Sequence, residues 1–247
     1  MDKPGVLVTR AHDGFSDLLA DNGFRVFNLE VTRTIELEDL AAAKSLISRS
    51  AAYDGCIITS PIAARIFIRE SKVMDVPRAA KIYVLGDRSR EIFVSEGINV
   101  ESRSEANTAD ELVSAFGLEE FADKSLLFIR GERSMRTIPD MLGGSCVMDE
   151  AVVYRTECQV LSSETTDNIR NMVRNSEIQW ITFFAPSAAE CFFTAFDSKE
   201  LGGLRMAAIG RSTARAISKA GLKVDYVSER AKAADFAAGL VRQIKTH

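Results

Sequence analysis

Small hydroxyl residues and glycines follow an apolar, strand-like run at Met206–Ile209. Gly210 comes next, and Ser212 and Thr213 open an alanine-rich segment with helical spacing. We expect Ser212 at the N-cap, where a hydroxyl accepts from the free N–H groups of the first turn. A helix that begins directly after a strand presents N–H donors and partial positive charge, which suits anion binding. A single segment of this kind is more often a capped helix that binds nothing.

The same arrangement occurs more than once in the chain. Three pairs of similar segments occur in the same order in the two halves of the chain, and the members of each pair are separated by nearly the same number of residues. They are Ile82–Val100 with Met206–Val224 at 124 positions, Cys56–Phe67 with Ile181–Phe192 at 125, and Val6–Thr34 with Leu127–Thr156 at 120 to 122. Matched blocks in one order indicate duplication of an α/β unit. We therefore expect each unit to contribute similar helix starts to ligand binding.

The candidate ligand-binding residues all follow predicted strands, because parallel sheets bind ligands at the carboxyl ends of their strands. They are Arg10, Thr59, Ser60, Gly86, Ser89, Arg130, Pro186, Ser187, Gly210, Ser212 and Thr213. Hydroxyls, helix starts and a few arginines suit carboxylates and other anions. Arg10 and Arg130 are explained equally well as solvated surface charges.

Other kinds of chemistry are excluded by what the sequence lacks. The histidines are His12 and His247 alone, which excludes a Ser-His-Asp device and a histidine-rich metal site. Paired carboxylates are missing from the candidate positions, so glycosidase-type catalysis is not expected. The glycine-rich fingerprints of dinucleotide and P-loop nucleotide sites do not occur either.

Length and composition indicate a chain of two domains. With 247 residues and 46% hydrophobic residues, the chain suffices for two ordinary cores. The net charge is −4 with both signs interspersed, so neither a nucleic-acid nor a membrane surface is an expected partner. Without a charged-then-apolar leader or an apolar stretch near 18 residues, we expect a cytoplasmic protein.

The four cysteines lie singly in the sequence. Cys56, Cys146, Cys158 and Cys191 form no CxxC pair and have no histidine neighbour at metal-ligand spacing. We therefore expect all four to be reduced core residues.

Strand-like and helix-like segments alternate along the chain, which indicates α/β domains with parallel, doubly covered sheets of the flavodoxin or Rossmann kind. Val31–Ile35 and Ala151–Thr156 are β-branched segments with alternating polar residues, which suit an exposed two-stranded ribbon. We expect residues 1–31 and 158–247 to form one discontinuous domain and residues 36–150 the second, with 31–36 and 150–158 as the linker. Two connecting segments also favour a mobile hinge.

Motifs along the whole chain resemble those of uroporphyrinogen-III synthases. In order they are TR at 9–10, YDGCIITSPIAA at 53–64, VLGDRS at 84–89, IRGERS at 129–134, VVYRT at 152–156, ITFFAPSAA at 181–189 and AAIGRSTARAISKAG at 207–221. The last block and the VYxT motif are the more specific ones. The resemblance implies two α/β domains joined by a ribbon, with the N-terminal unit completing the sheet of the C-terminal half.

The resemblance also implies a reaction. Linear hydroxymethylbilane, an octacarboxylate, would lose its hydroxyl and close to uroporphyrinogen III with ring D inverted, through a spiro-pyrrolenine. This lyase of tetrapyrrole and haem biosynthesis needs no cofactor, and we expect a monomer to which the preceding enzyme could hand its product. Tyr154 matches the tyrosine of the VYxT motif and is the expected proton donor, since a phenol stays protonated at neutral pH. The simpler explanation is that Tyr154 is an aromatic residue that packs in the linker ribbon and has no catalytic role.

The chain departs from the family pattern in three places. Ala11 follows TR where many bacterial members have Pro, Ser89 stands for a frequent Thr, and Ala185 replaces a frequent Ser. The last change removes a hydroxyl and an N-cap, so contact there would pass to backbone N–H groups or Ser187. A two-domain anion-binding sensor and a nucleotide-sugar transferase are the alternatives, but the first usually has a leader or DNA-binding module, and the second an acidic or histidine catalyst.

Overall fold

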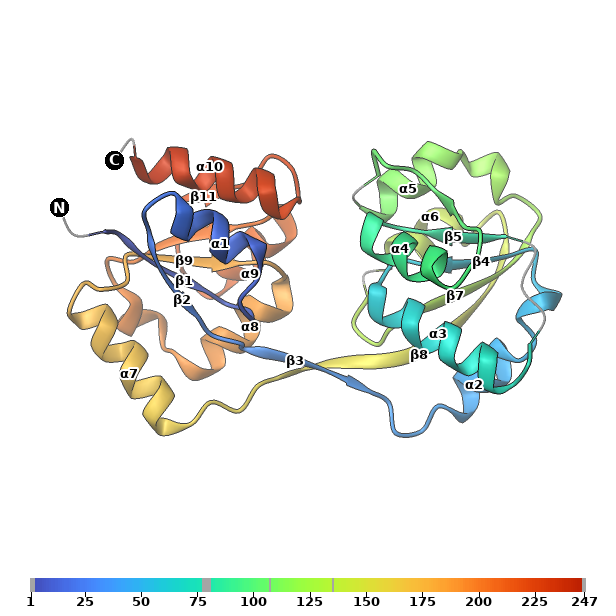
Figure 1. Cartoon of the computed structure of the whole chain (residues 1–247), viewed down its shortest axis with the longest axis horizontal. Helices are drawn as coiled ribbons and strands as arrows, with labels where there is room; N and C mark the ends of the chain where they lie inside the picture. The colour runs from blue at the N-terminus through green and yellow to red at the C-terminus, as the bar shows by residue number, and fades with distance from the viewer. Residues whose placement is uncertain (1–2, 77–80, 107, 135, 246–247) are drawn as a thin grey trace. The chain divides into compact units, whose positions relative to one another are not determined.

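The chain folds as two compact α/β units. The computed structural model describes residues 3–76, 81–106, 108–134 and 136–245. Unit 1 comprises Met1–Arg33 with Glu157–His247, and unit 2 comprises Thr34–Thr156 (Figure 1). Each unit contains a sheet built on parallel strands, which confirms the expected fold class. No helix in the described ranges is long and apolar enough to cross a membrane.

Strand order in each sheet differs from order in the chain. Unit 1 has the order β11-β10-β9-β1-β2, with these strands at Tyr226–Val227, Arg205–Ala208, Trp180–Phe183, Gly5–Val8 and Arg25–Asn28. Unit 2 has the order β3-β8-β7-β4-β5-β6, with strands at Thr32–Glu36, Val147–Cys158, Ser125–Gly131, Gly55–Ile58, Ile82–Val84 and Glu101–Ser102.

The two sheets correspond strand for strand under the duplication. Strands β2, β1, β9, β10 and β11 of unit 1 match β8, β7, β4, β5 and β6 of unit 2. Each copy of the repeat therefore contributes its first two strands to the sheet formed by the other copy. The strand β1 pairs with β9 across the sequence, and β7 pairs with β4. The N-terminal half of this exchange was implied by the family resemblance.

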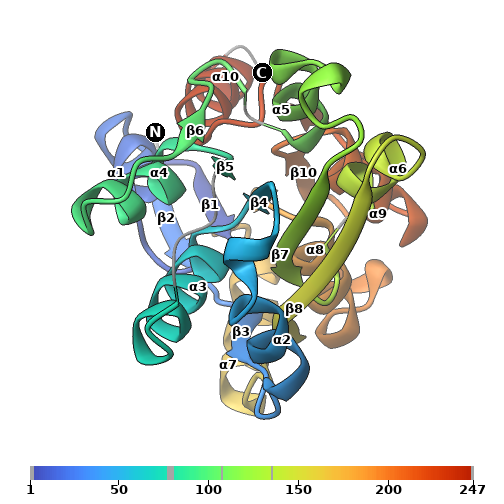
Figure 2. The same ribbon diagram turned by 90° about the vertical axis from the view of Figure 1, so that its right-hand side faces the viewer.

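Helices cover both faces of each sheet because the central strands are apolar on both sides. In unit 2, α2 (Ala41–Ile47), α3 (Pro61–Val73) and α4 (Asp87–Ser95) pack on one face, and α5 (Ala109–Phe116) and α6 (Thr137–Leu142) on the other (Figure 2). In unit 1, α7 (Ser163–Arg174), α8 (Pro186–Ala195) and α9 (Arg211–Lys219) oppose α1 (Gly14–Asp21) and α10 (Ala233–Lys245). Strands β1, β4 and β9 are buried along their whole length.

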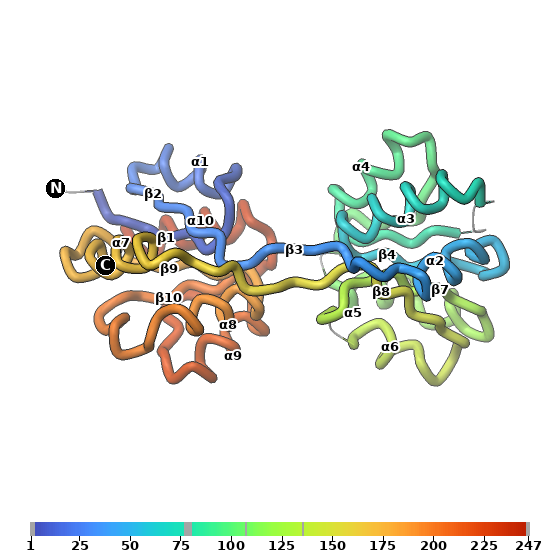
Figure 3. The backbone as a smooth tube through the Cα atoms, turned by 90° about the horizontal axis from the view of Figure 1, so that it is seen from below, coloured from blue at the N-terminus to red at the C-terminus, as the bar shows by residue number. Residues whose placement is uncertain are grey.

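The two chain segments that connect the units are β3 and β8, seen as neighbouring tubes in Figure 3. The N–H of Leu37 donates to the carbonyl of Val153 at 3.2 Å, and the N–H of Gln159 donates to that of Val31 at 2.9 Å. The two hydrogen bonds are equivalent under the repeat, because Leu37 and Gln159 are 122 positions apart, and so are Val31 and Val153. The linker is therefore an antiparallel ribbon whose hydrogen bonds follow the repeat, and the expectation that its two segments pair is confirmed.

A disulfide joins Cys158, at the end of β8, to Cys191 in α8, with a Cα–Cα distance of 5.0 Å. The expectation of four reduced core cysteines is therefore wrong for this pair, and Cys158 is exposed. Cys56 and Cys146 are free, and burial raises the pKa of the Cys56 thiol to about 12. The pair was missed because its 33-residue separation closes only when β8 passes α8 in the folded unit.

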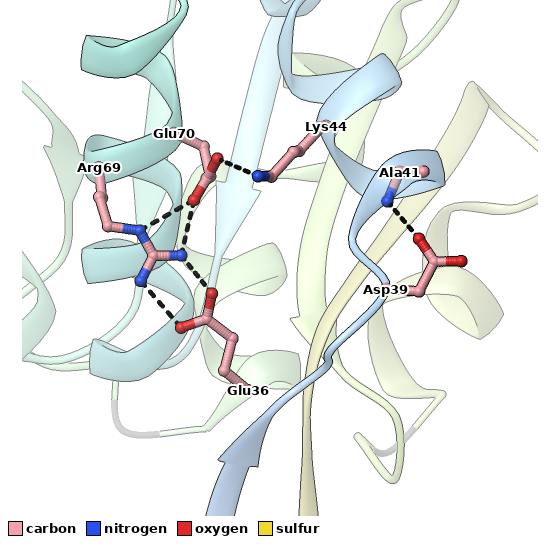
Figure 4. Close-up of polar contacts among 6 residues, drawn as sticks. All are labelled: Glu36, Asp39, Ala41, Lys44, Arg69 and Glu70. Atoms are coloured by element: carbon pink, nitrogen blue, oxygen red, sulfur yellow. Dashed lines mark hydrogen bonds and ion pairs between the residues drawn. The ribbon is translucent and has the colours of Figure 1, made fainter.

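An ionic cluster fixes the other end of the linker (Figure 4). Arg69 of α3 donates to both carboxylate oxygens of Glu36, the last residue of β3, and from Nε to Glu70 at 2.8 Å. Lys44 of α2 lies 3.1 Å from Glu70, whose side chain is only 6% exposed. Burial alone would raise the pKa of Glu70, but the hydrogen bonds from Arg69 and Lys44 outweigh it and hold the pKa below its ordinary value.

Replacing Glu70 by Gln should lower the free energy of unfolding by about 1–3 kcal/mol at neutral pH, because two charge-assisted contacts are lost. A carboxylate whose pKa is lower in the folded state contributes fully above about pH 4.3, and the contribution is lost as pH falls through the folded pKa. Urea denaturation of both proteins between about pH 3 and pH 7 measures this. A difference between them that stays constant over that range would contradict the assignment.

Candidate functional site

The predicted ligand residues lie at the carboxyl ends of neighbouring strands within each unit. In unit 1 the register places the ends of β1, β9 and β10 side by side, followed by Arg10, by Pro186 and Ser187, and by Gly210, Ser212 and Thr213. In unit 2 the ends of β7, β4 and β5 are neighbours, followed by Arg130, by Thr59 and Ser60, and by Gly86 and Ser89. Each unit therefore has one edge where these groups gather.

The helix starts of unit 2 differ in how they are capped. Ser60 is the N-cap of α3, and its hydroxyl accepts from the N–H of Ala63 at 3.2 Å. Thr59 is half-buried beside it. Gly86 precedes α4 with a φ of 80°, a left-handed conformation that favours glycine, and contributes no side-chain cap. The first-turn N–H groups of α4 therefore have no side-chain acceptor at the N-cap.

Ser89 lies in the first turn of α4 but points away from solvent. It is 1% exposed, and its Oγ has no hydrogen-bond partner within the described residues. Its predicted part in ligand binding consequently needs a change of rotamer or helix position. At this helix start Gly86, Asp87 and Arg88 are exposed, and the N-cap provides no side-chain acceptor for the backbone N–H groups that follow.

The two helices of unit 1 that follow β9 and β10 both lack a side-chain cap. Ala185 is the N-cap of α8, with Pro186 after it, so the hydroxyl missing from the sequence is also missing from the cap. Gly210 is the N-cap of α9. The expectation that Ser212 is this N-cap is therefore wrong, because the helix begins at Arg211, two residues earlier than expected, and leaves Ser212 exposed within the first turn. Thr213 is 1% exposed.

The two predicted arginines are engaged within their own units. Arg10 lies 2.6 Å from Asp13, and its guanidinium stacks 3.5 Å from the ring centre of Phe184. Arg130 is 17% exposed, pairs with Glu150 and donates to the carbonyl of Gly131 at 2.8 Å. Such partners favour a structural role in shaping the edge over direct capture of a ligand carboxylate.

Two further arginines, Arg90 and Arg103, were not predicted. They line a pocket of about 280 Å³ with Gly86, Asp87, Ser102 and Ser104, at the carboxyl end of β6. Arg103 stacks 3.9 Å from the ring centre of Phe116 and donates to the carbonyl of Ser102. No carboxylate of the described chain lies within 4 Å of either guanidinium. The sequence signal was weak because β6 has only two residues.

Unit 1 also has a pocket beside its edge strand, β11. A pocket of about 440 Å³ lies at the carboxyl end of β11, the repeat equivalent of β6, and Ser228, Arg230 and Arg242 are among its lining residues. Both edge strands therefore have an arginine-containing pocket beside them, but the walls differ, because α4 lines the pocket of unit 2 and α10 lines that of unit 1.

Tyr154 is positioned by a β-bulge between β7 and β8. Arg130 pairs with Val152, but the next residue, Gly131, pairs with Tyr154, so Val153 is the extra residue. The half-buried ring of Tyr154 lies against Gly131, where any Cβ would come within 2.5 Å of the ring atoms. Gly131 thus makes room for the tyrosine at the strand end where the ligand residues of unit 2 gather.

The different capping of α3 and α9 predicts different effects of removing a serine hydroxyl. The Ser60→Ala variant should lose about 0.5–2 kcal/mol of unfolding free energy, because Ser60 caps α3. The Ser212→Ala variant should stay within about 0.5 kcal/mol of wild type, because Ser212 is exposed and is not the N-cap. Equal losses in chemical denaturation would contradict this assignment of the caps.

Comparison with known proteins places the whole chain in one group. The family model described as uroporphyrinogen-III synthase HemD matches residues 13–238. A uroporphyrinogen-III synthase of Chlorobaculum parvum is 27% identical over 97% of this chain and 99% of its own length.

Solved structures show the same fold. A mutant uroporphyrinogen III synthase of the extremely thermophilic bacterium Thermus thermophilus aligns with a TM-score of 0.65 at 16% identity, over 99% of this chain and 100% of its own. Uroporphyrinogen-III synthetase of Helicobacter pylori 26695 aligns with a TM-score of 0.62 at 17% identity, with the same coverage of both chains. With the family model matching nearly from end to end, this chain belongs to the uroporphyrinogen-III synthase family.

Proposed function

We propose that the chain converts linear hydroxymethylbilane into uroporphyrinogen III, with loss of water and inversion of ring D. The observation that carries this proposal is the family match over residues 13–238, together with a relative of that name that aligns over its full length. The reaction belongs to tetrapyrrole and haem biosynthesis and makes the protein a lyase. No observation favours the alternative of an anion-binding sensor.

The substrate's carboxylates are suited to the strand edges described above. Uncapped helix starts at Gly86, Ala185 and Gly210 offer backbone N–H donors with partial positive charge. Donors of this kind bind carboxylates without a strongly basic protein, which agrees with the net charge of −4. We propose that both units take part, because an octacarboxylate presents more anionic groups than one helix start can bind.

Positioning accounts for much of the catalysis in this proposal. The free substrate also closes unaided, to the uninverted isomer, so the protein must hold the chain for attack through the substituted carbon of ring D. Loss of the hydroxyl requires one proton, which Tyr154 would supply. The proton passes from the phenol to the departing hydroxyl, which leaves as water, and the ring closure that follows releases a proton.

Several finer points remain predictions. They are the monomeric state, the cytoplasmic location, transfer of substrate from the preceding enzyme, and hinge motion at β3 and β8. Small-angle scattering with and without product would test the hinge, and identical profiles would contradict it.

Incubation with freshly made hydroxymethylbilane, followed by separation of the type I and type III products, tests the reaction itself.

Tyr154→Phe tests the proton donor. The ring and its packing on Gly131 are kept, so stability should change little, whereas kcat should fall by about 10²–10⁴-fold, as is typical for loss of a positioned acid. The remaining product should still be mainly type III, because the carboxylate contacts decide which carbon is attacked. A folded variant with the wild-type rate would assign Tyr154 to packing alone.

Arg103→Gln tests the pocket beside Gly86. Loss of a charged donor should raise KM by about 10-fold, since a hydrogen bond to a charged group contributes about 1.5–3 kcal/mol and water restores part of it. Arg49→Gln is the matched control, because Arg49 precedes β4 at the opposite end of the same sheet and is exposed. Equal KM values for the two variants would remove Arg103 from the site.

A further inference from the structure

The disulfide lies at a position whose repeat equivalent in unit 2 is the ion pair of Glu36 with Arg69. An offset of 122, which relates Val31 to Val153, relates Glu36 to Cys158. Glu36 is the last residue of β3, and Cys158 is the last residue of β8. Both residues therefore stand at the end of a linker strand, where the chain enters a unit.

Each of these two residues is attached to the corresponding helix of its unit. Glu36 is bound by Arg69 of α3, the helix that follows β4. Cys158 is bonded to Cys191 of α8, the helix that follows β9, and β4 and β9 are equivalent strands. One linker end is thus held by an ion pair and the other by a covalent bond that reduction can break.

We propose that Cys158–Cys191 is a reversible thiol–disulfide exchange site, whose reductant is a dithiol and whose oxidant is a disulfide compound. The exposure of Cys158 makes its sulfur the one open to attack, whereas Cys191 is 4% exposed and lies in the apolar core of unit 1. This inference does not rest on the proposed reaction.

The exchange balances in two steps. A thiolate of the dithiol attacks the sulfur of Cys158, the bond between the two protein sulfurs breaks, and Cys191 leaves as a thiolate that takes up a proton. The second thiolate of the reagent then attacks its own sulfur in the mixed disulfide and releases Cys158, which is protonated in turn. The reagent ends as a disulfide and the protein as two thiols; oxidation is the reverse.

Breaking the bond alters how the linker end is held. The remaining contacts of this segment include the Gln159 hydrogen bond to Val31 and the ion pair of Arg33 with Glu157 at 3.1 Å. The bond also holds the helix that carries a candidate ligand residue, because Ser187 and Cys191 are one helical turn apart in α8. The redox state therefore affects both the linker end and the helix whose first turn includes Pro186 and Ser187.

The test equilibrates the full chain with mixtures of reduced and oxidised dithiothreitol, quenches the exchange, and alkylates the free thiols in denaturant so that the buried Cys56 also reacts. Mass spectrometry then counts the modified cysteines. We expect a change from four alkylated cysteines to two, with Cys56 and Cys146 modified in both states. The oxidised form should melt about 5–15 °C higher, because the bond closes a 33-residue loop. Four alkylated cysteines in every mixture would overturn the proposal, as would two in every mixture.

Three variants make the assignment specific. Cys158→Ser should abolish the redox-dependent shift in melting temperature, whereas Cys146→Ser, the matched control, should keep it. Glu36→Gln should lower the melting temperature equally in both redox states, since its anchor is ionic. A shift that survives in Cys158→Ser would overturn the proposal; were that variant unfolded, the thiol count of the wild type would still decide.

Discussion

Each sheet is completed by strands from the other half of the chain, and the rest of the structure depends on this exchange. Strand β1 lies beside β9, and β7 lies beside β4, so the centre of each sheet joins residues far apart in sequence. These strands are apolar and buried on both faces, which makes their pairing obligatory for a closed core. Neither unit has a complete sheet until both copies of the repeat have been made.

The exchange also explains why there are two linker segments. If each copy folded on itself, one connection would suffice; because the first strands cross over, the chain must pass between the units twice. The two passages pair as β3 and β8, and their hydrogen bonds follow the repeat. The ends of these strands need anchors, and the two copies use different chemistry at equivalent positions, Arg69 with Glu36 in one and Cys191 with Cys158 in the other.

The carboxyl ends of the strands in each sheet suit anions mainly through the backbone N–H groups of the helices that follow them. Of the helices that follow β4, β5, β9 and β10, only α3 has a side-chain cap, so the first-turn N–H groups of α4, α8 and α9 remain available to a ligand. The arginines that the sequence offers as carboxylate partners, Arg10 and Arg130, are instead held by Asp13 and Glu150. A protein with a net negative charge can therefore bind a highly anionic substrate, because its positive potential is local.

The sequence by itself determined the features that depend on local patterns. The apolar run at Met206–Ile209 predicted a buried strand, which is β10, and the β-branched segments Val31–Ile35 and Ala151–Thr156 predicted the two strands of the linker. Repeat spacing predicted two similar units and the pairing of the linker segments. These features follow from residues within a few positions of one another, or from regularities in the order of the chain.

Tertiary structure alone decided what depends on contacts between distant segments. The disulfide needed β8 to pass α8, the pairing of Arg130 needed β8 beside β7, and the pocket of Arg90 and Arg103 needed a two-residue strand beside β5. The cap of α9 moved from Ser212 to Gly210 because a helix can begin at any of several adjacent residues, and only the path of the chain leaving β10 selects one.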